Sequence, residues 1–451
     1  MNTKDKSPGA DFANVDFGDK RLNKRLQAAV ENLATNAQKS ILGAERGRSG
    51  AKAFYRLLGN EKFDMDKMAD SAKAATISRM SGTVLLIQDT TDINLNGHKK
   101  TEGLGYSSEL VRGVKVHSCI AVTPEGLPLG LVSQYYDTRP EAKSALSKQE
   151  KKARPIEEKE SYRWIKMLDE STLCIPEETN VVTVCDREGD FYELFAQARE
   201  LEENFVVRLV QDRITETNEK ALGQIRRTKA AGQVTVDIPR NTRSNIPAHR
   251  AEMEVAYSAI SVRKPTNAVD GSLPGSLVMS IVRITEIGAE GREPIEWILA
   301  TSLPLNSIND AMVIVEYYMQ RWKIERFHFV LKSGCNAEKI QQRTYERIKP
   351  MILIYSVIAM YIMAVTYIGR VLPNTTCDLF LSTDEWQILY RVAHKTKAPP
   401  KKPYSMADAV MYLGQLGSYR RSPSDGPPGL KSIWSGLFRL YEFMDLFMGQ
   451  V

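Results

Sequence analysis

The order of apolar runs between residues 83 and 210 constrains the fold of this chain more than any other feature. Three strand-like runs come first, TVLLIQDTTDINL, GVKVHSCIAVT and GLPLGLVSQYYD, with Gly and Pro between them. A helical pattern around YRWIKML, a fourth run NVVTVCDREGDF, a second helical pattern and a fifth run NFVVRLV follow. We therefore expect a mixed five-stranded sheet with flanking helices, in which the fourth strand lies beside and parallel to the first.

This α/β plan is that of an RNase H-like domain, which we place over residues 76–375. Between about residues 212 and 305 the pattern is strand-like again, in QVTVDIP, RAEMEVAYSAISV, SLVMSIVRIT and EWILATSLP, and predicts an all-β insertion. From about residue 307 to residue 372 we expect helical structure. Residues 1–75 and 376–451 show helical periodicity and predict helical N-terminal and C-terminal domains. A chain of 451 residues is too long for one compact core, so several domains are expected.

Composition narrows the class of protein. The five cysteines are odd in number and form no C-x-x-C pair, which argues against a disulfide framework and a structural zinc. The N-terminal residues MNTKDKSPGADF contain no apolar run, so we expect no signal peptide and a reducing cytoplasm. The net charge of +6 is compatible with a polyanionic partner without requiring one.

The run MILIYSVIAMYIMAVTYIG, residues 351–369, carries no charge and is long enough to span a bilayer. The same composition suits a helix at the centre of a large domain, and this run follows directly on a helix with one polar face. We therefore expect a buried helix and no membrane partner.

Two aspartates end strands that the predicted fold makes neighbours. Asp89 lies in LLIQDTT on the first strand, and Asp186 ends the fourth in VVTVCDREGD. Because the strands are parallel, the two carboxylates are expected side by side at the sheet edge where ligands of α/β proteins gather. Each aspartate alone has a simpler explanation as a helix cap or turn residue.

The segment YMQRWKIERFHFVLK, residues 318–332, carries a polar stripe when it is drawn as one helix at about 100° per residue. Tyr318, Arg321, Glu325 and Lys332 project at roughly 0°, 300°, 340° and 320°. The apolar residues of the opposite side are Ile324, Phe327, Val330 and Leu331. The ordinary explanation of the stripe is a solvated face with an Arg321–Glu325 ion pair worth about 0.3–0.5 kcal/mol.

A second explanation joins the stripe to the two aspartates. If Glu325 packs against their edge, three carboxylates converge, and like charges about 4 Å apart repel by roughly 4 kcal/mol at an effective dielectric near 20. Two Mg²⁺ ions, for which Mn²⁺ can substitute, would compensate this charge and support displacement at a phosphodiester. Arg321 and Lys332 would then face phosphate oxygens, and Tyr318 could donate a hydrogen bond there.

The four stripe residues match the signature Y-x2-R-x3-E-x6-K, in which the chain resembles the IS4-family DDE transposases. Asp89 in IQDTT and Asp186 in VCDREGD resemble the other two members of the family's acidic triad. The resemblance covers nearly the whole chain. DFANVDFGDKRLNKRL with AFYRLLGN is similar to the family's end-binding domain, and MADAVMYLGQLGSY with IWSGLFRLYEFMDLF is similar to its dimerisation region.

The resemblance implies a homodimer that synapses the inverted-repeat ends of an element in double-stranded DNA and moves the element by cut-and-paste transposition into target DNA. Asp89, Asp186 and Glu325 are then the catalytic metal ligands. Metal-activated water nicks the 3′ end, the freed 3′-OH forms a hairpin on the opposite strand, the hairpin is reopened, and the end is joined to target DNA. The implied location is the bacterial cytoplasm, in association with the nucleoid.

The resemblance also assigns two residues outside the signature. Trp297, in PIEWILATS, matches the position where the family stacks a flipped base, although a Trp in a strand is more often a core residue. Arg208, in FVVRLV, resembles a further DNA contact.

Basic residues interleaved with Phe54 and Tyr55 predict DNA binding by the N-terminal domain, although they could also only keep its helices soluble. They are Lys20, Arg21, Lys24, Arg25, Arg48, Lys52 and Arg56. Two other functions stay open. One is a non-catalytic DNA-binding regulator, against which the intact acidic triad argues. The other is an RNase H-class nuclease without strand transfer, which a DNA-joining assay would distinguish.

Overall fold

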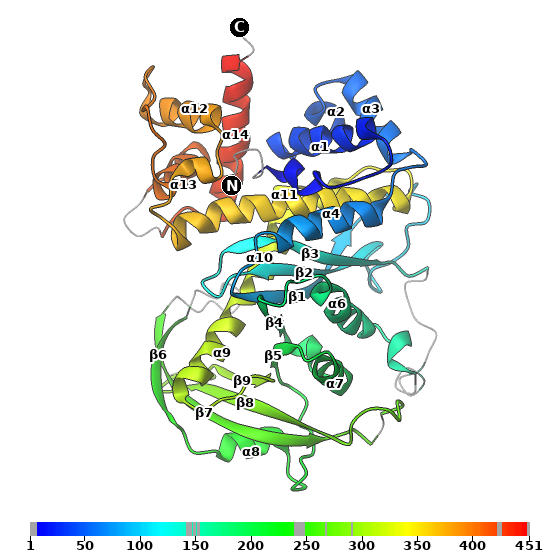
Figure 1. Ribbon diagram of the computed structural model, residues 1–451, viewed down its shortest axis with the longest axis vertical. Coiled ribbons are helices and arrows are strands. Elements are labelled where there is room, and N and C mark those ends of the chain that lie inside the picture. Colours follow the sequence, from blue (N-terminus) through cyan, green and yellow to red (C-terminus); the bar gives the residue numbers. More distant parts are fainter. Residues whose placement is uncertain are drawn as a thin grey trace. The chain divides into compact units, whose positions relative to one another are not determined.

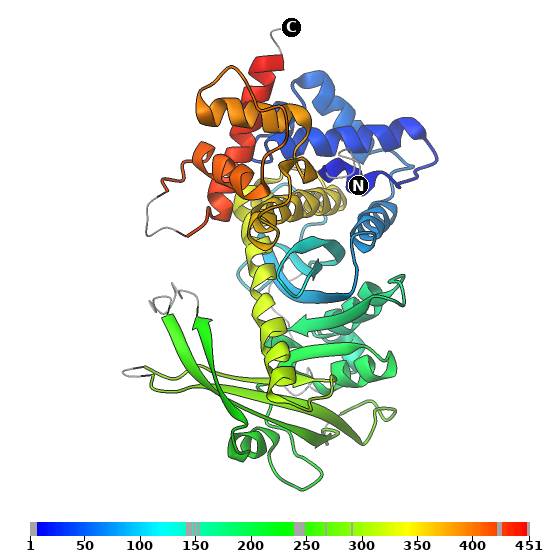
Figure 2. The ribbon, with the colours of Figure 1, turned by 60° about the vertical axis from the view of Figure 1, so that its left-hand side comes forward.

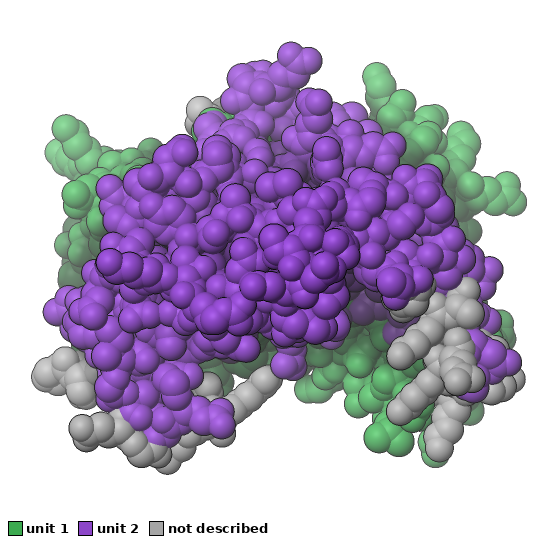
Figure 3. All heavy atoms as spheres, turned by 90° about the horizontal axis from the view of Figure 1, so that it is seen from below, with its two compact units in different colours: residues 1–81, 90–144, 323–451 green, residues 82–89, 145–322 purple. Residues whose placement is uncertain are grey.

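The computed structural model describes residues 7–140, 147, 150, 154–238, 249–266, 268–289, 292–421 and 426–448. The chain forms two compact units, which Figure 3 colours separately. Unit 1 comprises residues 1–81, 90–144 and 323–451, and unit 2 comprises residues 82–89 and 145–322. The parts of the predicted domains at residues 1–6, 239–248, 422–425 and 449–451 lie outside the described residues.

In the described part of the chain, nine strands form one mixed sheet in the order β3-β2-β1-β4-β5-β9-β8-β7-β6. The strands are β1 (Thr83–Asn94), β2 (Gly113–Val122), β3 (Pro128–Asp137), β4 (Asn180–Cys185), β5 (Asn204–Arg208), β6 (Gly232–Ile238), β7 (His249–Arg263), β8 (Ser276–Glu286) and β9 (Glu296–Thr301). The order of the first five is that of an RNase H-like core, so the predicted fold class is confirmed.

The parallel pairing predicted for the first and fourth strands is present in unit 2. β1 pairs with β4 from Thr83 opposite Asn180 to Ile87 opposite Val184, and β4 continues parallel to β5. Helix α6 (Tyr162–Thr172) precedes β4, and α7 (Tyr192–Glu200) follows it. Their apolar faces, which include the fully buried Trp164 and Phe195, form one core with β5, β8 and β9. This core holds the carboxyl ends of the parallel strands in place.

The insertion contains the four predicted strands and differs from the prediction in two ways. First, β9 pairs antiparallel with β5, with Val207 opposite Ala300, so the inserted strands extend the central sheet. Pairing there satisfies the backbone groups that β5 would otherwise present at a sheet edge. Second, the short helix α8 (Ala221–Arg227) lies within the insertion, beside the long strands β7 and β8 (Figure 1). The described insertion is therefore not purely β.

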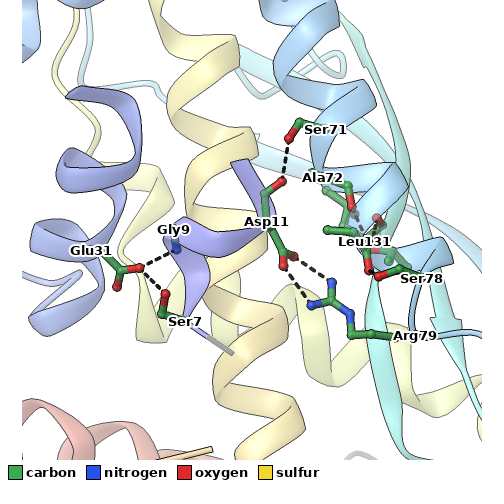
Figure 4. Close-up of polar contacts among 11 residues, drawn as sticks. Ser7, Gly9, Asp11, Glu31, Ser71, Ala72, Ser78, Arg79 and Leu131 are labelled. Atoms are coloured by element: carbon green, nitrogen blue, oxygen red, sulfur yellow. Dashed lines mark hydrogen bonds and ion pairs between the residues drawn. The ribbon is translucent and has the colours of Figure 1, made fainter. Parts of the chain in front are cut away.

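The N-terminal part of unit 1 is helical, as predicted. Its elements are the 3-10 helix η2 (Pro8–Phe12) and the helices α1 (Lys20–Thr35), α2 (Ile41–Ala44), α3 (Arg48–Leu58) and α4 (Met65–Ile77). Asp19 caps α1 by accepting a hydrogen bond from the backbone N–H of Arg21. Figure 4 shows how η2 is fixed: Asp11 accepts two hydrogen bonds from Arg79, at 2.8 and 2.9 Å, and Glu31 accepts from Ser7 and from the N–H of Gly9.

The long apolar run forms α11 (Tyr345–Val371), which by length and composition could cross a membrane. In its most apolar 18-residue window, 94% of the residues are buried inside the protein. The helix contacts β3 and the C-terminal helices α13 (Met406–Leu416) and α14 (Leu430–Met448), which follow α12 (Thr383–His394) (Figure 2). Its burial confirms the prediction of a core helix. In the described residues, the five cysteines form no disulfide.

The helical stretch predicted from about residue 307 to residue 372 is present, but it is divided into several helices. The segment consists of α9 (Ile308–Gln320), α10 (Trp322–Phe329), the π-helix η5 (Val330–Gly334) and the 3-10 helix η6 (Ala337–Lys339), and α11 follows. A π-helix has a longer turn than an α-helix, so a wheel at about 100° per residue does not apply at Lys332. The predicted apolar residues are nevertheless fully buried: Ile324, Phe327, Val330 and Leu331.

Candidate active site

The pairing of β1 with β4 places Asp89 and Asp186 at equivalent positions. Each lies two residues beyond the last paired residues, Ile87 and Val184. The preceding residues of both strands are mostly buried and apolar, with Gln88 and Thr183 as buried polar exceptions, so Asp89 and Asp186 are the first acidic side chains where the parallel pairing ends. This part of the predicted site is assembled by the fold of unit 2 alone.

Asp186 is also a helix cap. It precedes the 3-10 helix η4 (Arg187–Gly189), and its Oδ1 accepts a hydrogen bond of 2.7 Å from the backbone N–H of Glu188. The cap occupies one oxygen and leaves Oδ2 for another ligand. The capping role weighed in the sequence is therefore present, and it is compatible with a role in the site.

Arg321 lies against the first aspartate. Its Nη1 is 3.8 Å from Oδ2 of Asp89, and both side chains are largely buried, with 15% and 17% of their surfaces exposed. Arg321 is the residue at the end of α9. A guanidinium at this place reduces the repulsion between the two carboxylates and can also contact a phosphate.

Tyr318 connects the aspartates to the inserted strands. Burial raises the pKa of its hydroxyl, whereas the positive charges of Arg321 and Arg208 lower it, as does a hydrogen bond with Arg208. The negative charge of Asp186 also acts on Tyr318, in the raising direction. The Tyr318 ring meets Trp297 edge-on, with ring centroids 5.5 Å apart. Six predicted residues of unit 2 thus belong to one connected group: Asp89, Asp186, Arg208, Trp297, Tyr318 and Arg321.

Trp297 is half-buried on β9, where it pairs with Ile284 of β8. Arg208 is the last residue of β5 and donates a hydrogen bond of 3.4 Å to the carbonyl oxygen of Glu296. Because β9 is the neighbour of β5, the insertion brings Trp297 to the part of the sheet that carries Arg208. Trp297 is therefore neither a fully buried core residue nor a fully exposed one.

A supporting ion pair was not predicted. The carboxylate of Asp190 is fully buried, and it accepts hydrogen bonds from the backbone N–H groups of Val210 and Gln211 and from Arg213, at 2.5, 2.6 and 2.5 Å. These bonds fasten the segment after β5 to the segment that contains Asp186. Asp190 is the second aspartate of the motif DREGD and could be seen in the sequence. Its burial could not be predicted, because it depends on Arg213, which lies 23 residues later in the chain.

Glu325 and Lys332 lie in unit 1. Glu325 is half-buried in the first turn of α10, and Lys332 is half-buried in η5. Burial lowers the pKa of His328 to about 3, and the positive charge of Lys332 acts in the same direction. In the described residues, no group of three or more His, Cys, Asp and Glu side chains is arranged to hold a metal ion. The convergence of Glu325 with the two aspartates stays a prediction.

The donor atoms that unit 2 supplies suit a hard divalent cation. Asp89 and Asp186 offer carboxylate oxygens at equivalent positions just beyond the pairing of β1 with β4, and carboxylate oxygen is the ligand type that Mg²⁺ and Mn²⁺ prefer. Neither a thiolate nor an imidazole belongs to the predicted set. The chemistry of these donors therefore fits the predicted ions.

The basic residues of the N-terminal domain fall into two groups. Arg25 donates to the buried Glu45, at 2.5 Å, and to the carbonyl oxygen of Gly50, at 2.8 Å, so its guanidinium joins α1 to the start of α3. The other predicted side chains are exposed: Lys20, Arg21, Lys24, Arg48, Lys52 and Arg56. The last three line a hollow of about 560 Å³ together with Tyr55 and Arg347.

Three family models match the chain. They are described as transposase DNA-binding, over residues 9–63, transposase DDE domain, over residues 157–362, and transposase Tn5 dimerisation domain, over residues 357–447. The DDE match includes Asp186 and Glu325 and begins after Asp89. The assignment of Asp89 to the site therefore depends on the register between β1 and β4.

One similar solved structure is the cryo-EM structure of the piggyBac transposase synaptic complex with hairpin DNA. It has 11% sequence identity and a TM-score of 0.38, over 97% of this chain and 73% of that chain. A likeness at this level is too weak to support an inference about the present chain.

Proposed function

We propose that this chain, which is an IS4-family DDE transposase with Tn5-type DNA-binding, DDE and dimerisation domains, performs cut-and-paste transposition through hairpin ends. The N-terminal domain binds the terminal repeats of the element. The DDE domain cuts the DNA, closes and reopens a hairpin at each end, and joins the freed 3′-OH to target DNA. The dimerisation domain pairs two chains, so that both ends are handled together.

The predicted site residues have distinct tasks in this proposal. Asp89 and Asp186 would hold the divalent ions at the reacting phosphodiester, and Glu325 would supply the third carboxylate. Arg321 neutralises charge beside Asp89 and contacts a phosphate, since its guanidinium is already 3.8 Å from that carboxylate. Arg208 and Tyr318 orient the strand by hydrogen bonds, and Trp297 stacks a base that leaves the duplex when the hairpin forms. Lys332 binds a neighbouring phosphate as a point charge.

When bound, the Mg²⁺ ions stabilise the charge that develops on the attacking and leaving oxygens of the displacement. The protein positions the strand, excludes bulk water from the half-buried carboxylates, and spreads positive charge over the phosphate. No protein nucleophile is needed for such a displacement, because water or the 3′-OH attacks the phosphorus. The proposed place of action is the bacterial nucleoid.

The observation that carries this proposal is the equivalent placement of Asp89 and Asp186, each two residues beyond the parallel pairing of β1 with β4, with Arg321 beside Asp89. The test uses the inverted repeats that flank the coding sequence, cloned on either side of a marker, with purified protein, Mg²⁺ and a target plasmid. We expect hairpin-ended excised DNA and marker insertions in the target. Cleavage without insertions would favour the nuclease alternative, and binding without cleavage would favour the regulator.

A further inference from the structure

Three cationic side chains gather around one tyrosine ring in unit 1. The Nζ of Lys323, on α10, lies 3.6 Å from the centroid of the Tyr367 ring, and the Cζ of Arg370 lies 5.0 Å from the same centroid. Arg326, one turn along α10 from Lys323, adds its positive charge to both Lys323 and Tyr367. The cluster therefore joins the start of α10 to the end of α11.

The cluster is accessible from solvent. Arg326 and Arg370 are exposed, Lys323 is half-buried, and the Tyr367 ring beneath them is 9% exposed. Arg370 also donates a hydrogen bond of 2.9 Å to the carbonyl oxygen of Pro428, which limits the freedom of its side chain. The Arg370 guanidinium is thus tied to the chain, and both it and the Lys323 ammonium lie close to the same largely buried ring.

Bringing like charges together costs electrostatic free energy, and the binding of an anion offsets this cost. The charged groups that act on Lys323 are Arg370 and Arg326, both positive, in addition to its burial. The Tyr367 ring offsets part of the repulsion by cation–π attraction. A group of cations with exposed tips over an apolar base is the arrangement that attracts a polyanion to a surface.

A second lysine–tyrosine pair in unit 1 provides a contrast. The Nζ of Lys349 lies 5.2 Å from the Tyr345 ring centroid, but Glu346 contacts this ammonium at 2.6 Å. There the charge is compensated within the chain. Lys323 also lies against a tyrosine ring, but its neighbours Arg326 and Arg370 are both positively charged.

We propose that Lys323, Arg326 and Arg370 bind a phosphodiester of the DNA backbone at a place separate from the acidic triad. Lys323 precedes Glu325 by two residues on α10 and so projects about 200° away from it, on the opposite face of the helix. Two guanidinium forks and an ammonium match the oxygens of a phosphate. The inference rests on the proposed function, since it assumes that DNA passes both faces of α10.

The test measures the salt dependence of DNA binding by the full-length chain, for Lys323→Gln and Arg370→Gln. The Kd for duplex DNA is determined by fluorescence anisotropy at several KCl concentrations, with end DNA and with an unrelated sequence. Loss of one phosphate contact reduces the slope of log K against log salt by about 0.9. We expect that reduction in each variant, equal for both DNA sequences, because a phosphate contact carries no sequence information.

Three further variants make the result decisive. Lys323→Arg keeps the charge and is expected to restore the slope. Lys349→Gln removes a lysine that is paired in the chain and is expected to leave the slope unchanged. Arg326→Gln changes an exposed side chain and reports on the cluster even if Lys323→Gln or Arg370→Gln lowers stability, which thermal unfolding monitors.

The outcomes separate this inference from the proposed function. Wild-type slopes in folded Lys323→Gln, Arg326→Gln and Arg370→Gln, with DNA cleavage intact, would overturn the phosphate site and leave the transposase proposal in place. A wild-type protein that binds and cleaves no DNA would overturn both.

Discussion

Asp186 combines two roles that substitution can separate. Its Oδ1 caps η4 through the N–H of Glu188, and an asparagine keeps an oxygen in that position. We therefore expect Asp186→Asn to fold and to bind end DNA with unchanged affinity, while cleavage falls by roughly a hundredfold or more, because several kcal/mol of charge stabilisation is lost. Cleavage is measured on labelled end DNA, and affinity by gel shift.

The matched control for this substitution is Glu188→Gln. Glu188 lies beside Asp186 and pairs with Arg163 at 3.3 Å on the surface. Glu188→Gln also removes one negative charge but leaves the proposed metal ligands in place, so cleavage is expected to stay near that of the wild type. Full cleavage by Asp186→Asn would refute its assignment to the site.

Trp297 is proposed to act in hairpin formation and not in the first nicking step. Its ring and the Tyr318 ring meet in a T-shaped arrangement, and the side chain is half-buried, so part of it is accessible to a base. Stacking on an aromatic side chain is worth about 1–3 kcal/mol per base. We expect Trp297→Ala to nick normally and to form hairpins about 5- to 100-fold more slowly, and Trp297→Phe to recover most of that loss. Both products are quantified on denaturing gels. Equal loss of nicking and hairpin formation would contradict base stacking.

At the scale of elements, periodicity predicted the strands better than the helices. The alternating runs that became β6, β7, β8 and β9 were recognisable because side chains of a strand alternate between two faces. Their attachment to β5 depends on a pairing between residues 206–208 and 299–301, which no local pattern specifies. Likewise, η5 and the break before α11 lie in a sequence whose apolar spacing suits an α-helix and a π-helix equally well over five residues.

The candidate site also contains residues that local sequence patterns predict and residues whose role depends on tertiary contacts. Asp89 and Asp186 could be predicted because each ends an apolar run and the strand order places them together. Asp190 could not, since its burial results from Arg213 and two backbone N–H groups that follow β5. Arg25 was predicted as a DNA contact from its charge alone, and its pairing with Glu45 depends on the packing of α1 against the next helices.

The end of β8 carries a pH-sensitive ion pair. Hydrogen bonds from Arg292 hold the pKa of Glu286 at about 2, below its ordinary value of 4.5, despite the opposing effect of burial. Because the folded form releases the proton more readily than the unfolded chain, this stabilisation is complete above about pH 4.5 and is lost as the pH falls towards 2. We expect Glu286→Gln to be less stable than wild type at pH 6 and equally stable near pH 2 by urea unfolding. A difference that stays constant over this range would contradict the assignment, and exposed Glu252→Gln is the control.

Helices α13 and α14 approach each other closely at a glycine. A Cβ built on Gly436 would lie 1.9 Å from the carbonyl oxygen of Leu413, a backbone atom that cannot turn away. We expect Gly436→Ala to lower the free energy of unfolding by about 1–3 kcal/mol, although alanine favours helix, because overpacking outweighs propensity. Thermal and denaturant unfolding measure the change. Gly429→Ala, where a Cβ meets no atom within 4 Å, is expected to match the wild type.

At the scale of the whole molecule, the chain divides its chemistry between two units. The boundary falls after Asp89 in β1 and again between Trp322 and Lys323, so Arg321 belongs to unit 2 and Glu325 to unit 1. Each unit is stabilised by its own core, and each contributes carboxylates to the predicted triad.

Assembly with a second chain is expected to depend on the exposed end of α14. Leu446 is 63% exposed there, within the residues that match the Tn5 dimerisation domain. In a symmetric dimer each substitution counts twice, and burying one leucine is worth about 1.5–3 kcal/mol.

In the Asp186→Asn background, which prevents cleavage, mass photometry with end DNA is expected to show two chains and two DNA ends. Adding Leu446→Glu should weaken that species at least about tenfold and leave one chain bound to one end. Leu110→Glu, at a residue 88% exposed outside the dimerisation match, should leave the paired complex unchanged. Persistence of the paired complex in Leu446→Glu would place the dimer contact elsewhere.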